Sequence, residues 1–388
     1  MLIYLVVFGV CVFFSFLADR KKSDDFAFYL WSAAVVFLLT LLAGLRASTV
    51  GTDTTSYALP LYQLASLSDT FADFNSSSWY RVWRYSEVSS FEIGYLVLVW
   101  LSSRLGSFQI LLSLTSLLTI APIYAALAQK RNEASLPVSM MLFMLVYFNT
   151  TLNGMRQWVA IAFVFLAVFA LYRDDVPIFR QWKVILSMLI AFLFHTSAII
   201  GVLLLIVRAL LKKGNPLPRY LAISASALVV LLALGVMGRL LTVFGLEKYL
   251  TYIGTGSVHI VISALILQVP FLLLALYLYR SRRIDKRTAA FFLTVMTLSV
   301  IASQMASVGT HSGRVSLYFD IFAIPLAGLV TKTFTKRNDD GTAVSLIRQP
   351  LTVTFVPMLC LAYGIFYWVY YYLVSGSGET VPYMFFWQ

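Results

Sequence analysis

The sequence predicts an all-α polytopic membrane protein. Of its 388 residues, 60% are hydrophobic and only 12% are charged, whereas a soluble domain has roughly 45–50% apolar and about 25% charged residues. Apolar runs long enough to cross a bilayer recur along the whole chain. Because backbone polar groups cannot stay unpaired in lipid, each run should be helical. We therefore expect residues 1–388 to form a single integral membrane domain.

About 12 segments should cross the membrane, some of them as short or broken helices. The first is expected to be a retained helix, because it lacks a basic start and is followed by Asp19-Arg20-Lys21-Lys22. The segment 183–211 forms two short arms around His195. Both of its ends are basic, so both ends should lie on the cytoplasmic side. The expected spans lie near 1–18, 26–45, 107–128, 136–151, 156–172, 183–195, 197–211, 219–238, 259–279, 288–307, 314–332 and 350–373.

The stretch near 91–104 decides the topology. It is apolar but short, and an acid, Glu92, stands at its start. If it crossed the membrane, most basic loops, such as 280–287, would lie outside, against the positive-inside rule. If it is a re-entrant or interfacial helix, only Lys248 among the lysines lies outside. We therefore expect residues 46–106 to be an extracytoplasmic segment with a non-spanning helix.

The charge and cysteine content exclude several classes of protein. The net charge of +12 follows from the basic loops that orient a membrane protein and does not indicate nucleic-acid binding. Cys11 and Cys360 fall inside expected spans, without the spacing of a disulfide framework or a metal site. The chain has no P-loop, nucleophile-elbow or zinc-protease motif. We expect no cofactor and no metal.

Polar residues on the expected outer side are few and biased toward arginine. Arg46 and Asp53 follow the second span; they are either an anion-binding pair or a flanking arginine and an ordinary turn residue. Arg156 follows a break at Asn153-Gly154 and lies in the first turn of a helix. An arginine at the hydrocarbon boundary indicates function, and a helix N-terminus also favours anions. Phosphate or pyrophosphate is the natural partner.

Arginines alternate with aromatic residues ahead of the 91–104 helix. Aromatic rings could stack on sugars, and arginine forks could bind phosphate. The alternative is an interfacial aromatic belt, which is common at this depth in membrane proteins. The candidate sugar-binding residues are Trp79, Tyr80, Arg81, Trp83 and Arg84, together with Tyr95, Gln157 and His311.

Three residues could act as a general base: His195, Asp53 and Glu92. His195 lies at the apex of an apolar hairpin, although a lone histidine is more often a packed residue than a catalyst. Neutral imidazole is a competent base near pH 7, whereas a carboxylate would need desolvation. Glu92 could simply complement a helix dipole. The sequence favours His195 by a small margin and does not decide which of the three is the base.

Short motifs in a fixed order carry a family resemblance. The pattern resembles the EpsG family of Wzy-type bacterial polysaccharide polymerases over roughly residues 40–200, and by hydropathy over the whole chain. The usual proline after the glutamate is Ile93 here. The matching positions are Arg46, Gly51, Thr52, Asp53 and Tyr57; Glu92, Gly94 and Tyr95; Asn153, Gly154, Arg156 and Gln157; and Phe194, His195, Ser197 and Ala198.

The resemblance implies a membrane glycosyltransferase, with a GT-C-like architecture, on the outer face of the bacterial inner membrane. Such an enzyme transfers a glycan from one undecaprenyl-diphosphate carrier to another carrier-linked repeat unit, for O-antigen, capsule or exopolysaccharide. Its partners are then that donor, that acceptor and the bilayer, with a chain-length regulator and a flippase nearby and no nucleic acid. Arg46 and Arg156 would bind the pyrophosphate. Arg314 lies beyond the matching motifs, and its place on the expected outer side makes it a third candidate for the same role.

Two other functions remain compatible with these residues. A lipid-linked oligosaccharide flippase also has broken helices, but it should show repeated halves, and no repeat is visible. An O-antigen ligase or another lipid-linked-sugar transferase would use the same polar residues. A ladder of chain lengths made from lipid-linked repeat units would distinguish a polymerase from both.

We predict that single cysteines at Ser77 and Ser281 react differently with a membrane-impermeant thiol reagent in intact cells. Ser77 lies in the expected outer segment and Ser281 in an expected cytoplasmic loop, so only the first should be labelled. Permeabilised cells, in which both should react, provide the control. Labelling at Ser281 but not at Ser77 would reverse the topology.

Overall fold

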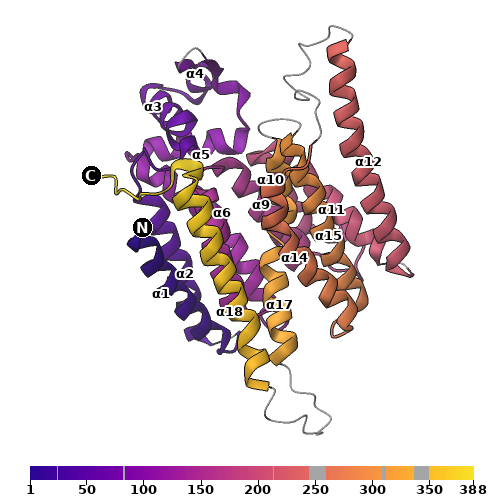
Figure 1. Ribbon diagram of the computed structural model, residues 1–388. Coiled ribbons are helices and arrows are strands. Elements are labelled where there is room, and N and C mark those ends of the chain that lie inside the picture. The colour runs from indigo at the N-terminus through magenta and orange to yellow at the C-terminus, as the bar shows by residue number, and fades with distance from the viewer. Residues whose placement is uncertain (24, 82–83, 213, 244–258, 308–311, 336–348) are drawn as a thin grey trace. The chain divides into compact units, whose positions relative to one another are not determined.

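The computed structural model describes residues 1–23, 25–81, 84–212, 214–243, 259–307, 312–335 and 349–388. In this part of the chain helices dominate, as Figure 1 shows. The chain divides into two compact units: unit 1 is Met1–Ile199 with Thr354–Gln388, and unit 2 is Ile200–Val353.

Unit 1 contains the long helices of the N-terminal half and the polar segments between them. Its elements are α1 (Leu2–Asp19), α2 (Phe26–Gly44), η1 (Thr54–Ala58), α3 (Leu59–Leu67), α4 (Phe71–Ser76), β1 (Ser78–Arg81), β2 (Arg84–Glu87), η2 (Val88–Ser90), α5 (Ile93–Arg104), α6 (Phe108–Gln129), α7 (Leu136–Leu142), η3 (Phe143–Tyr147), α8 (Phe148–Thr151), α9 (Met155–Phe165), η4 (Leu166–Leu171), η5 (Ile178–Arg180), α10 (Trp182–Phe194), η6 (Thr196–Ala198), most of α18 (Gln349–Tyr367), η10 (Trp368–Val374) and η11 (Ser377–Glu379).

Unit 2 is helical in its described residues, and one carboxylate, that of Asp320 in α16 (Leu317–Asp320), joins four of its elements. Asp320 accepts hydrogen bonds from Ser299, from Gln268 at 3.1 Å and from Ser316 at 2.8 Å. The elements are α11 (Ile199–Leu211), α12 (Pro216–Val243), α14 (Ile262–Ser281), α15 (Lys286–Ser303), η8 (Gln304–Ser307), η9 (Ser312–Ser316), α16 (Leu317–Asp320) and α17 (Ala323–Thr335).

Eight helices within the described residues are long and apolar enough to cross a membrane. This confirms a polytopic, mainly helical membrane protein. The other expected spans are helical but shorter, so that about 12 crossings and a GT-C-like architecture stay predictions. These shorter helices cover Leu136–Thr151, Met155–Leu171, Trp182–Phe194 and Thr196–Leu211, and Ile93–Arg104 is the helix expected not to cross.

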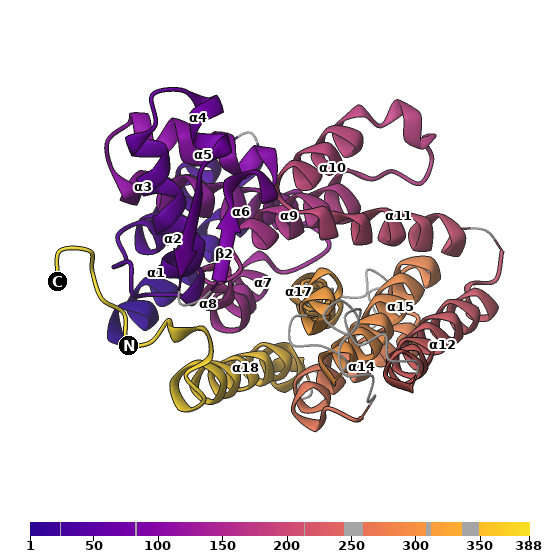
Figure 2. The same cartoon turned by 90° about the horizontal axis from the view of Figure 1, so that it is seen from above.

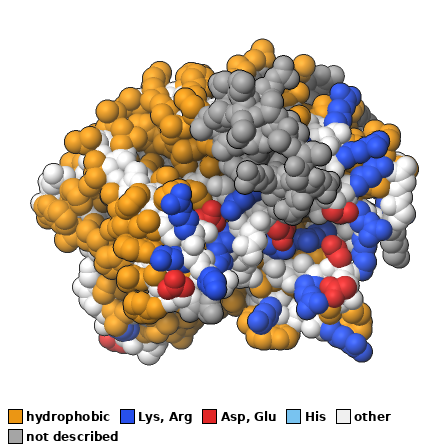
Figure 3. Space-filling model, turned by 90° about the horizontal axis from the view of Figure 1, so that it is seen from below, with side chains coloured by type: hydrophobic (Ala, Val, Ile, Leu, Met, Phe, Trp, Pro, Cys, Tyr) orange, Lys and Arg blue, Asp and Glu red, His pale blue; other side chains and the backbone are white. Residues whose placement is uncertain are grey.

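Basic turns lie together at one end of unit 1. Arg131, in the turn after α6, donates to the carbonyl oxygen of Lys21 at 3.2 Å and to Ser23 at 3.0 Å, in the turn between α1 and α2. Its guanidinium also lies 4.3 Å from the ring centre of Phe28. Figure 3 shows Lys and Arg side chains gathered on the face seen from below. Because α2 starts and α6 ends here, their other ends lie about 28 and 33 Å away along the helix axes. Which end faces outside stays a prediction.

Residues 46–106 fold into a cap at the opposite end of unit 1. Figure 2 shows α3, α4, α5 and β2 over the long helices in the view from above. Leu61, Phe74 and Val99 of the cap share a buried core with Leu111 of α6. The hairpin β1–β2 is antiparallel and pairs Tyr80 with Tyr85, a departure from the expected all-α composition. Aromatic residues, which favour strands, occur in both strands of this pair.

Close packing of α5 on α10 depends on a glycine. A Cβ atom at Gly94 would lie 2.6 Å from the carbonyl oxygen of Leu193 and 2.8 Å from its Cβ. Gly51 has a φ of +91°, and a Cβ there would lie 2.7 Å from the carbonyl oxygen of Leu152. The two motif glycines therefore let the cap approach the helix breaks around residues 152 and 195.

The C-terminal segment lies against the end of α2. Arg46 and Phe385 form an antiparallel bridge. The Ala47 amide donates to the carbonyl oxygen of Met384 at 2.8 Å, and the Phe386 amide donates to that of Leu45 at 2.9 Å. This pairing closes unit 1 over the residues that follow α2.

We predict that Gly94→Ala lowers the free energy of unfolding in detergent by about 1–3 kcal/mol, because the added methyl group must displace backbone atoms. Gly9→Ala is the matched control, since nothing lies within 4 Å of its added Cβ. Chemical denaturation of both variants checks the difference. Equal stability of the two would show that α5 and α10 do not pack this closely.

Candidate functional site

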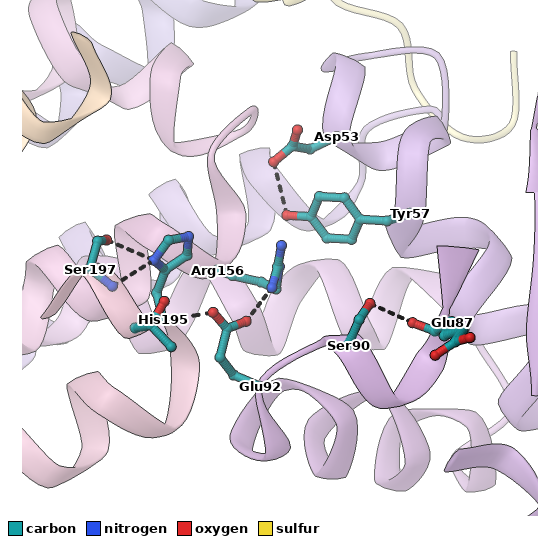
Figure 4. A network of polar contacts seen from close by, with 9 residues as sticks. Asp53, Tyr57, Glu87, Ser90, Glu92, Arg156, His195 and Ser197 are labelled. Atoms are coloured by element: carbon teal, nitrogen blue, oxygen red, sulfur yellow. Dashed lines mark hydrogen bonds and ion pairs between the residues drawn. The ribbon is translucent and has the colours of Figure 1, made fainter. Parts of the chain in front are cut away.

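The predicted polar residues of unit 1 converge from four separate segments, as Figure 4 shows. Asp53 comes from the turn before η1, Glu92 from the start of α5, Arg156 from the first turn of α9, and His195 from the turn after α10. The helix ends and turns that carry these four residues all lie in or next to the cap, which brings the side chains together.

Arg156 lies at the centre of this network. Its Nη1 forms an ion pair with Oε2 of Glu92. The guanidinium carbon lies 4.4 Å from the ring centre of Phe91, 4.9 Å from that of Tyr57 and 6.0 Å from that of Tyr95. Cation–π attraction replaces part of the lost hydration. The Arg156 side chain stays 20% exposed, so an anion can still reach it.

Glu92 connects Arg156 to the turn after α10. It stands at the N-cap of α5, where a negative charge complements the helix dipole. Its Oε1 accepts a hydrogen bond from the Thr196 amide at 3.2 Å, while Oε2 binds Arg156. Both carboxylate oxygens are therefore engaged, and the geometry favours a positioning role over that of a base.

The position of the proton on His195 follows from its hydrogen bonds. The residue has an extended backbone between α10 and η6, and its Nδ1 lies 3.2 Å from the Ser197 amide nitrogen and 2.7 Å from the Ser197 hydroxyl. Because an amide N–H can only donate, Nδ1 accepts, and the neutral ring carries its proton on Nε2. Neutral His195 therefore presents Nε2–H as a donor, which does not favour the base role that the sequence preferred.

Asp53 is fixed from two sides. Its amide donates to Oδ1 of Asn153 at 3.2 Å, and the Thr52 hydroxyl donates to the same oxygen. The Tyr57 hydroxyl donates to Oδ2 of Asp53 at 2.9 Å. Burial, and then the Asp53 charge, raise the pKa of Tyr57 well above its ordinary value, so the phenol keeps its proton at neutral pH. Asp53 is the candidate base that this geometry supports best.

Arg46 lies in the interior of unit 1 instead of on an open outer surface. It is 0% exposed. Its Nη1 donates to the carbonyl oxygen of Ala43, and its Nη2 lies 3.0 Å from the sulfur of Met155. Burial lowers the pKa of Arg46 to about 10, although nearby tyrosines oppose the shift. The side chain is therefore still charged at neutral pH, and it contacts Met155 at the start of α9.

The predicted sugar-binding residues fall into different environments. Tyr80 is 78% exposed and its ring centre lies 5.1 Å from that of Tyr85, whereas Trp79 packs on Phe91 at 5.7 Å. Tyr95 and Gln157 are buried, so direct sugar contact is not favoured for either. Arg81 and Arg84 are opposite each other at the end of the hairpin, Arg314 is an exposed residue of unit 2, and Trp83 and His311 lie outside the described residues.

Comparison with known proteins identifies the family. The model of the EpsG family matches residues 28–385, nearly the whole chain. The chain belongs to the EpsG family. No curated protein and no solved structure matches it. Membership supports a general role as a membrane glycosyltransferase-like polysaccharide polymerase.

Two residues of this EpsG-family site received no role from the sequence. Phe91 forms one wall around Arg156, and Tyr57 contacts both Asp53 and Arg156. The spacing of four between Asp53 and Tyr57 was a signal, since such residues lie on one helical face. Nothing in the spacing of Phe91 indicates its contact with a residue so distant in sequence. Groups of three or more metal-ligating side chains do not occur among the described residues.

We predict that Glu92→Gln lowers the free energy of unfolding in detergent by roughly 1–3 kcal/mol, because the largely buried Arg156 guanidinium loses its counter-charge. Glu87→Gln, an exposed carboxylate of the same cap, should change stability by less than about 0.5 kcal/mol. Denaturation curves of both proteins make the comparison. A Glu92→Gln protein as stable as the Glu87→Gln protein would remove the structural role assigned to the ion pair.

Proposed function

We propose that this EpsG-family protein polymerises undecaprenyl-diphosphate-linked oligosaccharide repeat units at the outer face of the bacterial inner membrane. The observation that carries the proposal is a guanidinium at a helix start, held by Glu92 and three aromatic rings and still partly exposed. Arginine and a helix N-terminus both favour phosphate groups. A lipid pyrophosphate at the membrane surface would meet both.

In the proposed reaction, the bond from the donor sugar's anomeric carbon to the pyrophosphate oxygen breaks. A hydroxyl group of the acceptor sugar forms the new bond to that carbon and loses its proton. The electron pair of the broken bond leaves with undecaprenyl diphosphate. Arg156 stabilises the charge that develops on this leaving group. No nucleotide sugar is consumed.

Asp53 is our choice for the group that takes the hydroxyl proton. Asp53 is partly exposed, and it is oriented by Tyr57 and by the Asn153 contact to its amide. Glu92 has both oxygens engaged, and the Nδ1 lone pair of His195 is engaged by Ser197. His195 would instead donate Nε2–H to a pyrophosphate or sugar oxygen. Arg46 would act indirectly, by supporting the start of α9.

The exposed hairpin of the cap is our candidate for sugar contact. Tyr80 and Tyr85 project beside each other from neighbouring strands. Aromatic faces of this kind stack on the apolar faces of sugars. Arg314 and His311 remain further candidates for the pyrophosphate and the sugar.

We predict that purified protein given a lipid-linked repeat unit makes a ladder of chain lengths, and that Asp53→Asn lowers turnover about 10²–10⁴-fold. His195→Gln should lose less, because glutamine also offers an N–H donor. Turnover measured from pH 5 to 9 on protein of checked stability compares the two. Robust turnover by Asp53→Asn with an inactive His195→Gln would return the base role to His195.

We also predict that Arg156→Lys loses most activity while the protein still inserts. Lysine keeps the charge but loses the planar group that pairs at its edge and stacks on its faces. Arg104→Lys is the control, because Arg104 stacks on Trp100 and binds carbonyl groups of α3 at the far end of α5. Normal polymer length with Arg156→Lys would mean that Arg156 is only a flanking charge.

A further inference from the structure

We propose that Tyr57 is a positioning residue that couples the carboxylate of Asp53 to the guanidinium of Arg156. The inference rests on the proposed function, because it gives those two residues their roles as base and pyrophosphate ligand. Tyr57 touches both of them: its hydroxyl group forms hydrogen bonds with Asp53 and with Arg156, and the Arg156 guanidinium also lies over its ring.

The hydroxyl group of Tyr57 sets the orientation of the carboxylate. It donates to Oδ2 of Asp53 at 2.9 Å across one wide helical turn, η1. A carboxylate can accept about four hydrogen bonds, so this bond orients Asp53 without exhausting it as an acceptor. The amide of Asp53 is held separately by Asn153. Backbone and carboxylate are thus fixed by different partners.

The ring of Tyr57 faces the other half of the site. The Arg156 guanidinium carbon lies 4.9 Å from the ring centre. A cation over the face of a phenol withdraws electron density from it and strengthens its O–H as a donor. The hydrogen bond to Asp53 therefore becomes stronger while Arg156 keeps its charge over the ring. When an anion binds Arg156, its charge is partly neutralised and the hydrogen bond from Tyr57 to Asp53 weakens. Tyr57 therefore makes the environment of the Asp53 carboxylate depend on whether an anion is bound to Arg156.

The rings around Tyr57 hold it in this position. Its ring centre lies 5.6 Å from that of Phe91 and 5.8 Å from that of Tyr95, the latter in an edge-to-face arrangement. The charged and titratable groups that face it are Asp53, Arg156 and Tyr95, and Glu92 is the counter-ion of Arg156. Tyr57 itself is buried, which excludes direct contact with a bulky sugar and leaves a role through its two neighbours.

Tyr57→Phe tests the coupling, because it removes the hydroxyl group and keeps the ring. Loss of a hydrogen bond to a charged group should lower kcat about 10- to 100-fold, with little change in KM. A carboxylate base works above its pKa, and loss of a donor to its charged form raises that pKa. The acid limb of the pH–rate profile should therefore move to higher pH. A purely structural role would not move that limb.

Tyr62→Phe is the matched control. Tyr62 is a tyrosine of α3 in the same cap, its ring centre lies 5.4 Å from that of Phe108, and it has no part in the proposed site. We expect Tyr62→Phe to keep kcat within about twofold and to leave the acid limb in place. Melting temperatures of both variants in detergent show whether the fold is kept, and the pH limb is read from whatever activity survives.

The outcomes separate the inference from the proposed function. An unchanged pH profile and rate in Tyr57→Phe, with Asp53→Asn inactive, would overturn the inference alone. Full activity of Asp53→Asn would overturn the assignment of the base and the inference with it. In a double-mutant cycle, the loss in Tyr57→Phe/Arg156→Lys should be smaller than the product of the single losses. Independent, multiplicative losses would show that Tyr57 serves Asp53 without coupling it to Arg156.

Discussion

The ion pair between Arg156 and Glu92 is the contact on which the cap end of unit 1 depends. The ion pair joins the start of α9 to the start of α5, and the hydrogen bond from the Thr196 amide to Glu92 joins the turn after α10 to both. The aromatic rings around Arg156 make its burial tolerable, because a guanidinium can pair at its edge while its faces lie against rings. The same arrangement keeps the Arg156 cation partly exposed, and in the proposed function the anionic headgroup of the lipid-linked donor would meet it there.

The motif residues also solve a problem that broken helices create. Each break leaves backbone N–H groups without helical partners, and such groups must be satisfied near a membrane. Asn153 accepts from the Asp53 amide, Glu92 from the Thr196 amide, and His195 from the Ser197 amide. Side chains that look like free catalytic groups in the sequence are therefore acceptors already in use. Because Glu92 and the Nδ1 atom of His195 serve in this way, we propose Asp53 as the base.

Burial changes the interpretation of several residues in the same way. Arg46 and Tyr95 stand at the expected outer side, but both are inside unit 1. The C-terminal segment, more than 300 residues away in sequence, pairs with the backbone around Arg46. No local pattern near residue 46 indicates that cover. In this protein, the position of a polar residue after a membrane span therefore does not predict that its side chain is exposed to a ligand.

The sequence by itself determined the membrane class, the positions of the long helices and the short motifs, because apolar runs and their breaks are local properties of the chain. It also indicated the family, which the match over residues 28–385 confirms. Only the tertiary structure decided which motif residues meet. The ion pair of Glu92 with Arg156, and the hydrogen bond from the Thr196 amide to Glu92, join residues that are far apart in the sequence. Spacing along the chain does not contain that geometry, because packing between distant helices creates it.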